Sequence, residues 1–215
     1  MRAFDDYVRI AEAGFDWRPH VSLKKNRVAV TPGSRTPVVE LPDALIYDWA
    51  GAAVVPHVTV EQVLAVLQSY DDYKHIYAPE IADSNVFSRH DNRWKIHLKL
   101  HKKEFFTANL ATEYDVEYRP LGAGRWAMLS RSTRIAEEEN GVLLPEGTGH
   151  GFLWRLNAYW LIEPQADGVY IECRAMSMSR DVPVGLGWAL KPVVARLPRE
   201  SLRETLEATV RALNR

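Results

Sequence analysis

The sequence contains little cysteine and no surplus of either charge. Cys173 is the single cysteine among 215 residues, so no intramolecular disulfide holds the fold together. The formal net charge is −1, which provides no overall attraction to nucleic acid or to anionic lipid. We therefore expect no nucleic-acid partner and a fold that depends on its hydrophobic core.

Long apolar runs are missing as well. No uninterrupted hydrophobic stretch approaches the roughly 20 residues that a membrane-spanning helix needs. The segment Met1–Tyr7 contains no apolar signal region. We expect a soluble protein, cytoplasmic as written, or periplasmic or exported if a signal peptide was removed before Met1. Transient contact with a membrane stays open, and so does the oligomeric state.

Motifs for cofactors, metals and nucleophiles are also absent. No glycine-rich phosphate loop precedes a helix, and no serine stands in a nucleophile elbow. His97 and His101 share a strand face, but Lys99 between them opposes a bound cation. The acidic run 137–139 predicts a solvated turn rather than a calcium site. We expect no metal and no cofactor, and we assign no catalytic residue.

The first 42 residues have a different sequence pattern from the rest of the chain. Residues 4–13 predict a helix that Gly14 ends, and residues 15–42 predict an irregular segment punctuated by proline. We therefore divide the chain into an N-terminal arm, residues 1–42, and a domain, residues 43–215. We expect the arm to be dispensable for the core fold, even if it packs on the outside.

The domain begins with a strand over residues 45–56. Thr59 and Gln62 form a capping box that opens a helix, and a tyrosine-rich helical segment follows as far as Pro79. Turn residues then separate six strand signals, at 84–90, 93–101, 104–119, 124–136, 150–163 and 168–180. The basic outer face of 93–101 and the acidic outer face of 104–119 favour pairing in an antiparallel hairpin. A helix that begins near Pro198 closes the chain.

This order predicts an α+β fold in which a seven-stranded curved antiparallel sheet wraps around the long C-terminal helix. Two short helices follow the first strand. The order resembles the helix-grip fold of the START-like (SRPBCC) superfamily, which includes polyketide cyclases, pollen allergens and lipid-transfer domains. The chain is most similar to bacterial START-like proteins of unassigned function. The stretches that carry the resemblance are LPDALIYDW (41–49), QSYDDY (68–73), SRSTRI (130–135), GHGFLWRLN (149–157) and SRDVP (179–183).

The resemblance implies a binding or transfer protein that holds a hydrophobic small molecule or lipid between the sheet and the last helix. One alternative is an enzyme of the polyketide cyclase or hydrolase type, with His150 or a Glu172–Arg134 pair as acid and base. Another is an interaction module that uses the arm or the tyrosine-rich segment 70–77. Alternation alone does not decide whether the sheet and helix meet as solid core or enclose a cavity.

The strand over 150–163 supplies the main candidate ligand residues. His150, Trp154 and Trp160 share one face of it, and these tryptophans either line a pocket or fill a solid core. Trp94, Leu98 and Tyr114 come from the apolar faces of two other strands. His150 is the polar exception, which either holds a ligand or caps the end of the strand.

Charged residues supply a second set of candidates. If the even-numbered face of 168–180 looks inward, Glu172 needs a partner, because an unpaired buried charge is costly. Arg134 shares its parity with Trp126 and Met128, so it is a candidate partner for Glu172 or for a ligand carboxylate. An exposed Arg134 fits the pattern equally well.

Overall fold

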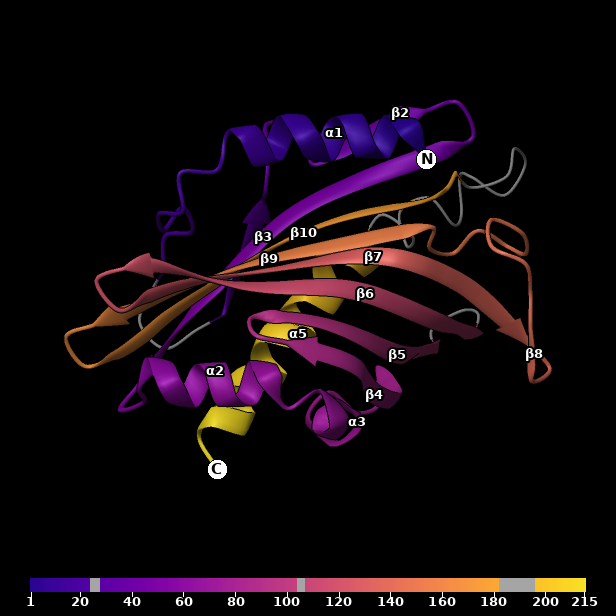
Figure 1. Ribbon diagram of the computed structural model, residues 1–215. Coiled ribbons are helices and arrows are strands. Elements are labelled where there is room, and N and C mark those ends of the chain that lie inside the picture. The colour runs from indigo at the N-terminus through magenta and orange to yellow at the C-terminus, as the bar shows by residue number, and fades with distance from the viewer. Residues whose placement is uncertain (24–27, 104–106, 182–195) are drawn as a thin grey trace.

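The computed structural model describes residues 1–23, 28–103, 107–181 and 196–215. Its centre is a curved antiparallel sheet with helices on both sides (Figure 1). The strands are β1 (Ala29–Pro32), β2 (Val38–Leu41), β3 (Ala44–Pro56), β4 (Ile81–His90), β5 (Arg93–Lys103), β6 (Thr107–Gly122), β7 (Arg125–Glu139), β8 (Val142–Leu143), β9 (Arg155–Gln165) and β10 (Gly168–Arg180). The helices are α1 (Arg2–Ala13), α2 (Val60–Gln68), η1 (Tyr70–Asp72), α3 (Tyr73–Ile76) and α5 (Leu197–Leu213).

The strands follow the order β1-β3-β10-β9-β7-β6-β5-β4, and every pair is antiparallel. The described part of the sheet has ten strands rather than the seven expected, because β1, β2 and the two-residue β8 are added. β1 and β2 both pair with β3, so the expectation of an irregular segment over residues 15–42 was wrong there. The N-terminal arm therefore contributes strands to the same sheet as the domain.

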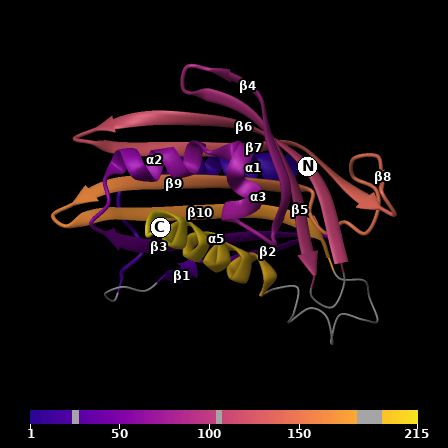
Figure 2. The same cartoon turned by 90° about the horizontal axis from the view of Figure 1, so that it is seen from below.

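Helix α5 lies across the concave face of the sheet (Figure 2). A Cβ atom placed on Gly51 of β3 would lie 2.6 Å from Leu206 of α5, so this glycine lets the helix approach closely. From β5, near the other edge, Lys102 Nζ lies 2.6 Å from Glu204 of α5. The sheet thus contacts α5 from both sides, which is the expected helix-grip arrangement. None of the described helices is long and apolar enough to cross a membrane.

The local predictions for the short helices are confirmed. Thr59 caps α2, with its side chain accepting from the Gln62 amide at 3.3 Å and the Gln62 side chain accepting from the Thr59 amide at 2.8 Å. The tyrosine-rich segment forms η1 and α3.

The N-terminal helix covers part of the convex face. Residues 2–13 form α1, followed by Gly14 as expected. Its buried Phe4 and Val8 join a cluster with Leu129 of β7 and Met176 of β10. The arm therefore shields apolar side chains that the sheet turns away from α5.

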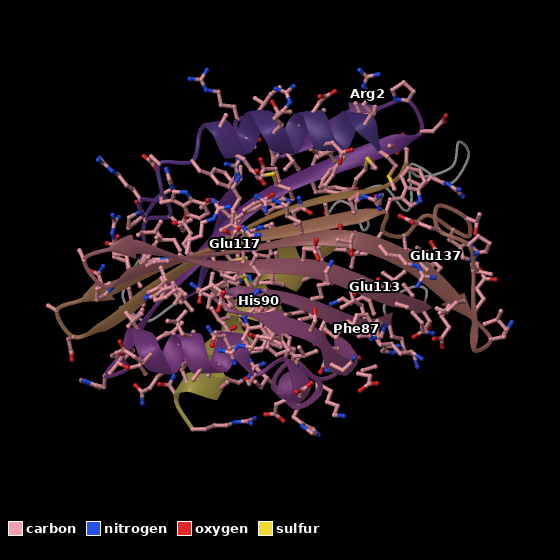
Figure 3. All side chains as sticks on the ribbon, viewed as in Figure 1. Arg2, Phe87, His90, Glu113, Glu117 and Glu137 are labelled. Carbon is pink, nitrogen blue, oxygen red and sulfur yellow. The ribbon has the colours of Figure 1, made fainter. Side chains whose placement is uncertain are left out.

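The outer surface of the β5–β6 hairpin carries the predicted charge pattern. Lys95 of β5 lies 2.9 Å from Asp115 of β6, and the register places Arg93 opposite Glu117. Figure 3 labels Glu113 and Glu117 on this outer side. The first residues of the strand predicted over 104–119, residues 104–106, lie outside the described part of the chain.

Candidate functional site

Aromatic side chains fill one half of the concave face, next to α2 and η1. The hydroxyls of Tyr70 and Tyr118 lie 2.6 Å apart, and the ring of Trp94 packs 5.3 Å from that of Tyr70. The Tyr73 and Tyr118 hydroxyls both donate to the carbonyl of Leu67, at 2.7 Å and 2.8 Å. We call this region the aromatic half. Its rings are in contact and its hydroxyls are paired, so it has the character of solid core.

Smaller side chains line the other half. The register aligns Trp49, Ala175, Ala158 and Ser130 in a row across β3, β10, β9 and β7. A second row holds Tyr47, Ser177 and Leu156 across β3, β10 and β9, with Ser132 and Tyr114 continuing it on β7 and β6. We call these two rows the small-residue half. Alanine and serine side chains leave space in this half, whereas large side chains fill the corresponding space in the aromatic half.

Three buried polar atoms in the small-residue half have no hydrogen-bond partner among the described residues: Tyr47 Oη, Trp49 Nε1 and Tyr114 Oη. Tyr114 is 4% exposed. Burial raises the pKa of its phenol to about 12, and Thr112 opposes the rise only in part. The Thr112 hydroxyl itself donates to the Leu98 carbonyl at 2.8 Å. A buried polar group without a partner costs about 1–3 kcal/mol, which a ligand that supplies the partner recovers.

The structure places four of the sequence candidates on the concave face. Leu98 and Tyr114 lie at the small-residue half, on neighbouring strands. Trp94 and Trp160 belong to the same hydrophobic cluster but lie in the aromatic half. Their positions on the inner face agree with the alternation, and their contact with a ligand stays a proposal.

Trp154 is not on the face that the sequence predicted. Strand β9 begins at Arg155 rather than at residue 150, so Trp154 precedes the strand and its alternation does not apply. Its side chain packs with the convex-face cluster of Phe4 and Met178, and the Arg180 guanidinium lies 5.8 Å from its ring. Trp154 and Trp160 therefore do not bracket one ligand.

His150 also falls outside the strand. Its imidazole is 63% exposed, and Nε2 lies 3.1 Å from Glu139 Oε1. The ring stacks on Phe152 at 5.0 Å. His150 thus lies in a surface loop, away from the small-residue half.

Arg134 and Glu172 are both on the outer side of the sheet and have different partners. The pairing of β6 with β7 shifts by one residue between Ser132 and Arg134, and this bulge reverses the alternation beyond it. Arg134 consequently donates to Glu113 at 3.1 Å on the outer surface. The Glu172 carboxylate accepts from the His20 and Val21 amides and from the Tyr170 hydroxyl. The predicted pair does not exist.

Sequence reasoning missed Glu137. It is 5% exposed, and its carboxylate accepts hydrogen bonds from the amides of His150, Gly151 and Phe152 at 2.7, 2.6 and 2.9 Å. The prediction of a solvated turn was therefore wrong for this residue. Gly149, at φ +84°, allows the close approach, because a Cβ there would lie 2.5 Å from Glu137 Oε2. The glycines flanking His150 were the only signal of this arrangement.

Two hollows among the described residues lie on the convex side instead. The larger, about 520 Å³, lies beneath α1 against Arg131 and Asn157, and the smaller, about 50 Å³, lies between the arm and Glu172. In the larger hollow Arg131 is paired with Glu12 at 2.8 Å, and in the smaller one Glu172 accepts from the arm amides. Neither hollow presents the unpaired donors of the small-residue half.

No family model matches the chain, and no curated protein sequence matches it. Solved structures resemble it in fold. A STAR-related lipid transfer protein from Xanthomonas axonopodis has a TM-score of 0.55 at 16% identity, covering 82% of this chain and 94% of that one. Human STARD10 has a TM-score of 0.54 at 9% identity, covering 84% and 76%. The di-domain aromatase/cyclase StfQ of the steffimycin biosynthetic pathway has a TM-score of 0.56 at 13% identity, covering 79% and 51%.

These similarities confirm the START-like, helix-grip fold that the sequence predicted. At such low identities they establish the fold alone, because unrelated functions share one fold.

Proposed function

We propose that this protein binds a hydrophobic small molecule or lipid between the concave face of the sheet and α5, as a binding or transfer protein. The observation that carries the proposal is the Tyr114 hydroxyl, which is buried on that face without a hydrogen-bond partner among the described residues. Pockets for small molecules are mostly apolar with a few well-placed polar groups, and the small-residue half has this composition.

The contrast between the aromatic half and the small-residue half supports a ligand site in the small-residue half. The hydroxyls of Tyr70, Tyr73 and Tyr118 in the aromatic half are all paired. Among the described residues, three of the four buried side-chain donors without a partner lie in the small-residue half, and the fourth, Trp154 Nε1, lies on the convex side. One structural neighbour is a STAR-related lipid transfer protein, which agrees with a lipid as the bound molecule.

The enzyme alternative has less support from the geometry. Aromatase/cyclases occur among the structural neighbours. However, His150 lies in an exposed loop, and Arg134 and Glu172 lie on the outer side with separate partners. The acid and base named from the sequence are therefore not assembled on the concave face.

Native mass spectrometry of the protein as purified, before and after organic extraction, tests the proposal. We expect a bound mass that extraction removes, and then binding of an environment-sensitive apolar dye to the extracted, folded protein. The absence of both a bound mass and a saturable dye site would contradict the proposal.

A cavity-filling variant tests the location. Ala158→Leu adds a larger side chain in the small-residue half, so it should weaken dye binding roughly tenfold or more at little cost in stability. Ala53→Leu is the matched control, because Ala53 is 3% exposed beside the buried Ile171. It should lower the free energy of unfolding by about 1–3 kcal/mol and leave the dye affinity of the folded protein unchanged. The opposite pattern would place the cavity elsewhere.

A further inference from the structure

The unpaired buried groups of the small-residue half are all uncharged and all able to donate a hydrogen bond. They are the hydroxyls of Tyr47 and Tyr114 and the indole N–H of Trp49. From these donors we propose that the ligand is electrically neutral and carries a hydrogen-bond-accepting oxygen, such as a ketone, ester or quinone carbonyl, which binds the Tyr114 hydroxyl. This inference rests on the proposed function and narrows its ligand class.

The charges on the inner face argue against an anionic ligand. The Glu137 carboxylate, itself an anion, accepts hydrogen bonds from three backbone amides. Lys102, on the inner side of β5, is paired with Glu204 at 2.6 Å and lies near Glu80 at 3.8 Å. A carboxylate or phosphate carried into the small-residue half would meet no unpaired cation there among the described residues, and burying an unpaired charge is far costlier than burying a carbonyl.

Arg199 is a cation close enough to the small-residue half to be considered as a partner for an anionic ligand. Its guanidinium lies 5.8 Å from the ring of Trp49, at the edge of the small-residue half. The residue is exposed, so its charge remains in water. It therefore does not supply a buried partner for an anion.

The position of the donors sets where the acceptor binds. Tyr47 and Tyr114 end the same cross-strand row, on β3 and β6, and four inter-strand steps separate them, about 19 Å along the sheet. One small acceptor cannot reach both donors along that path. We place the acceptor at Tyr114, whose cross-strand neighbour on β5 is the buried Ile96, and the Tyr47→Phe variant tests that choice.

Three naphthalene probes of similar size distinguish the possibilities: an uncharged alkylnaphthalene, the corresponding naphthyl ketone and the corresponding naphthyl carboxylate. We expect the ketone to bind the wild-type protein more tightly than the alkylnaphthalene, by about 3- to 10-fold for one net hydrogen bond. We expect the carboxylate at pH 8 to bind more weakly than either.

Tyr114→Phe should abolish the preference for the ketone and leave the affinity for the alkylnaphthalene within about twofold. Tyr47→Phe is the matched control, and it should retain the preference. Because the Tyr114 hydroxyl has no partner to lose, its removal should not destabilise the fold, which thermal melting verifies.

The outcomes distinguish failure of the proposed function from failure of this inference alone. If none of the three probes binds, both the proposed function and this inference fail. If the alkylnaphthalene binds but the ketone has no advantage that depends on Tyr114, the function stands and the inference is overturned. Tighter binding of the carboxylate, lost in Arg199→Gln, would likewise overturn it.

Discussion

Trp154 and Trp160 lie on opposite faces of the sheet, one in the convex-face cluster and the other in the concave-face cluster. Trp154 contacts the side that α1 covers, while Trp160 faces the side that α5 covers. A ligand on the concave face is therefore separated from Trp154 by the sheet itself.

Replacing Trp154 should not affect a ligand on the concave face. We expect Trp154→Phe to leave the affinity for an apolar dye within about twofold, since distant sites act independently. Fluorescence titration measures this. A tenfold loss of affinity in the folded variant would instead move the site to the convex side.

Replacing Glu137 should destabilise the protein. In Glu137→Gln the side chain loses its charge and presents a donor to amides that need acceptors, so we expect about 1.5–3 kcal/mol less free energy of unfolding. Urea unfolding measures the loss. Glu139→Gln is the control, because Glu139 is 45% exposed, and it should change stability by about 0.5 kcal/mol or less. Equal effects of the two variants would show that the amide contacts contribute nothing.

Removing residues 1–42 should leave a domain that still melts cooperatively but at a lower temperature. The deletion takes away the amides of His20 and Val21 from Glu172 and the Tyr7 hydroxyl from Asp48, and it uncovers the apolar convex face. We expect Tm to fall by roughly 10 °C or more, as a loss of several kcal/mol implies for a chain of this size. A truncated chain that melts without cooperativity, or that only aggregates, would show that the arm is part of the core.

The contact between α1 and the sheet should weaken in acid. Burial alone would raise the pKa of Glu12, but hydrogen bonds from Arg131 and Tyr159 outweigh it and lower that pKa below its usual value. A lowered pKa in the folded state means that the ionised carboxylate stabilises the fold above the unfolded pKa, roughly 4.3, and that this stabilisation disappears as pH falls through the folded value.

Hydrogen exchange of the α1 amides at pH 6 and at pH 3 tests this expectation. Protection of α1 should fall more than protection of α5 once the intrinsic pH dependence of exchange is corrected. In Glu12→Gln the extra loss should vanish. An unchanged difference between pH 6 and pH 3 in that variant would assign the acid effect to other carboxylates.

Local features were predictable because their causes lie within a few residues of one another. The capping box depends on Thr59 and Gln62, which are neighbours on one helical turn. The alternation over 93–101 correctly placed Trp94 and Leu98 on the inner face, and the same pattern in the next strand placed Tyr114 there. The resemblance to the helix-grip fold rests on the order of such elements.

The sequence by itself thus determined the elements, their order and most of the inner face, while the tertiary structure decided which side chains meet. One extra residue in β7, between Ser132 and Arg134, turns Arg134 outward, because strand parity is counted against the partner strand and not along the chain alone. Tyr47 and Trp49 gave no signal, since β3 is mostly apolar and buried on both faces, so alternation cannot separate the faces. Glu137 became an anchor only when a distant loop brought three amides to it, and contacts of that kind exist only in the folded chain.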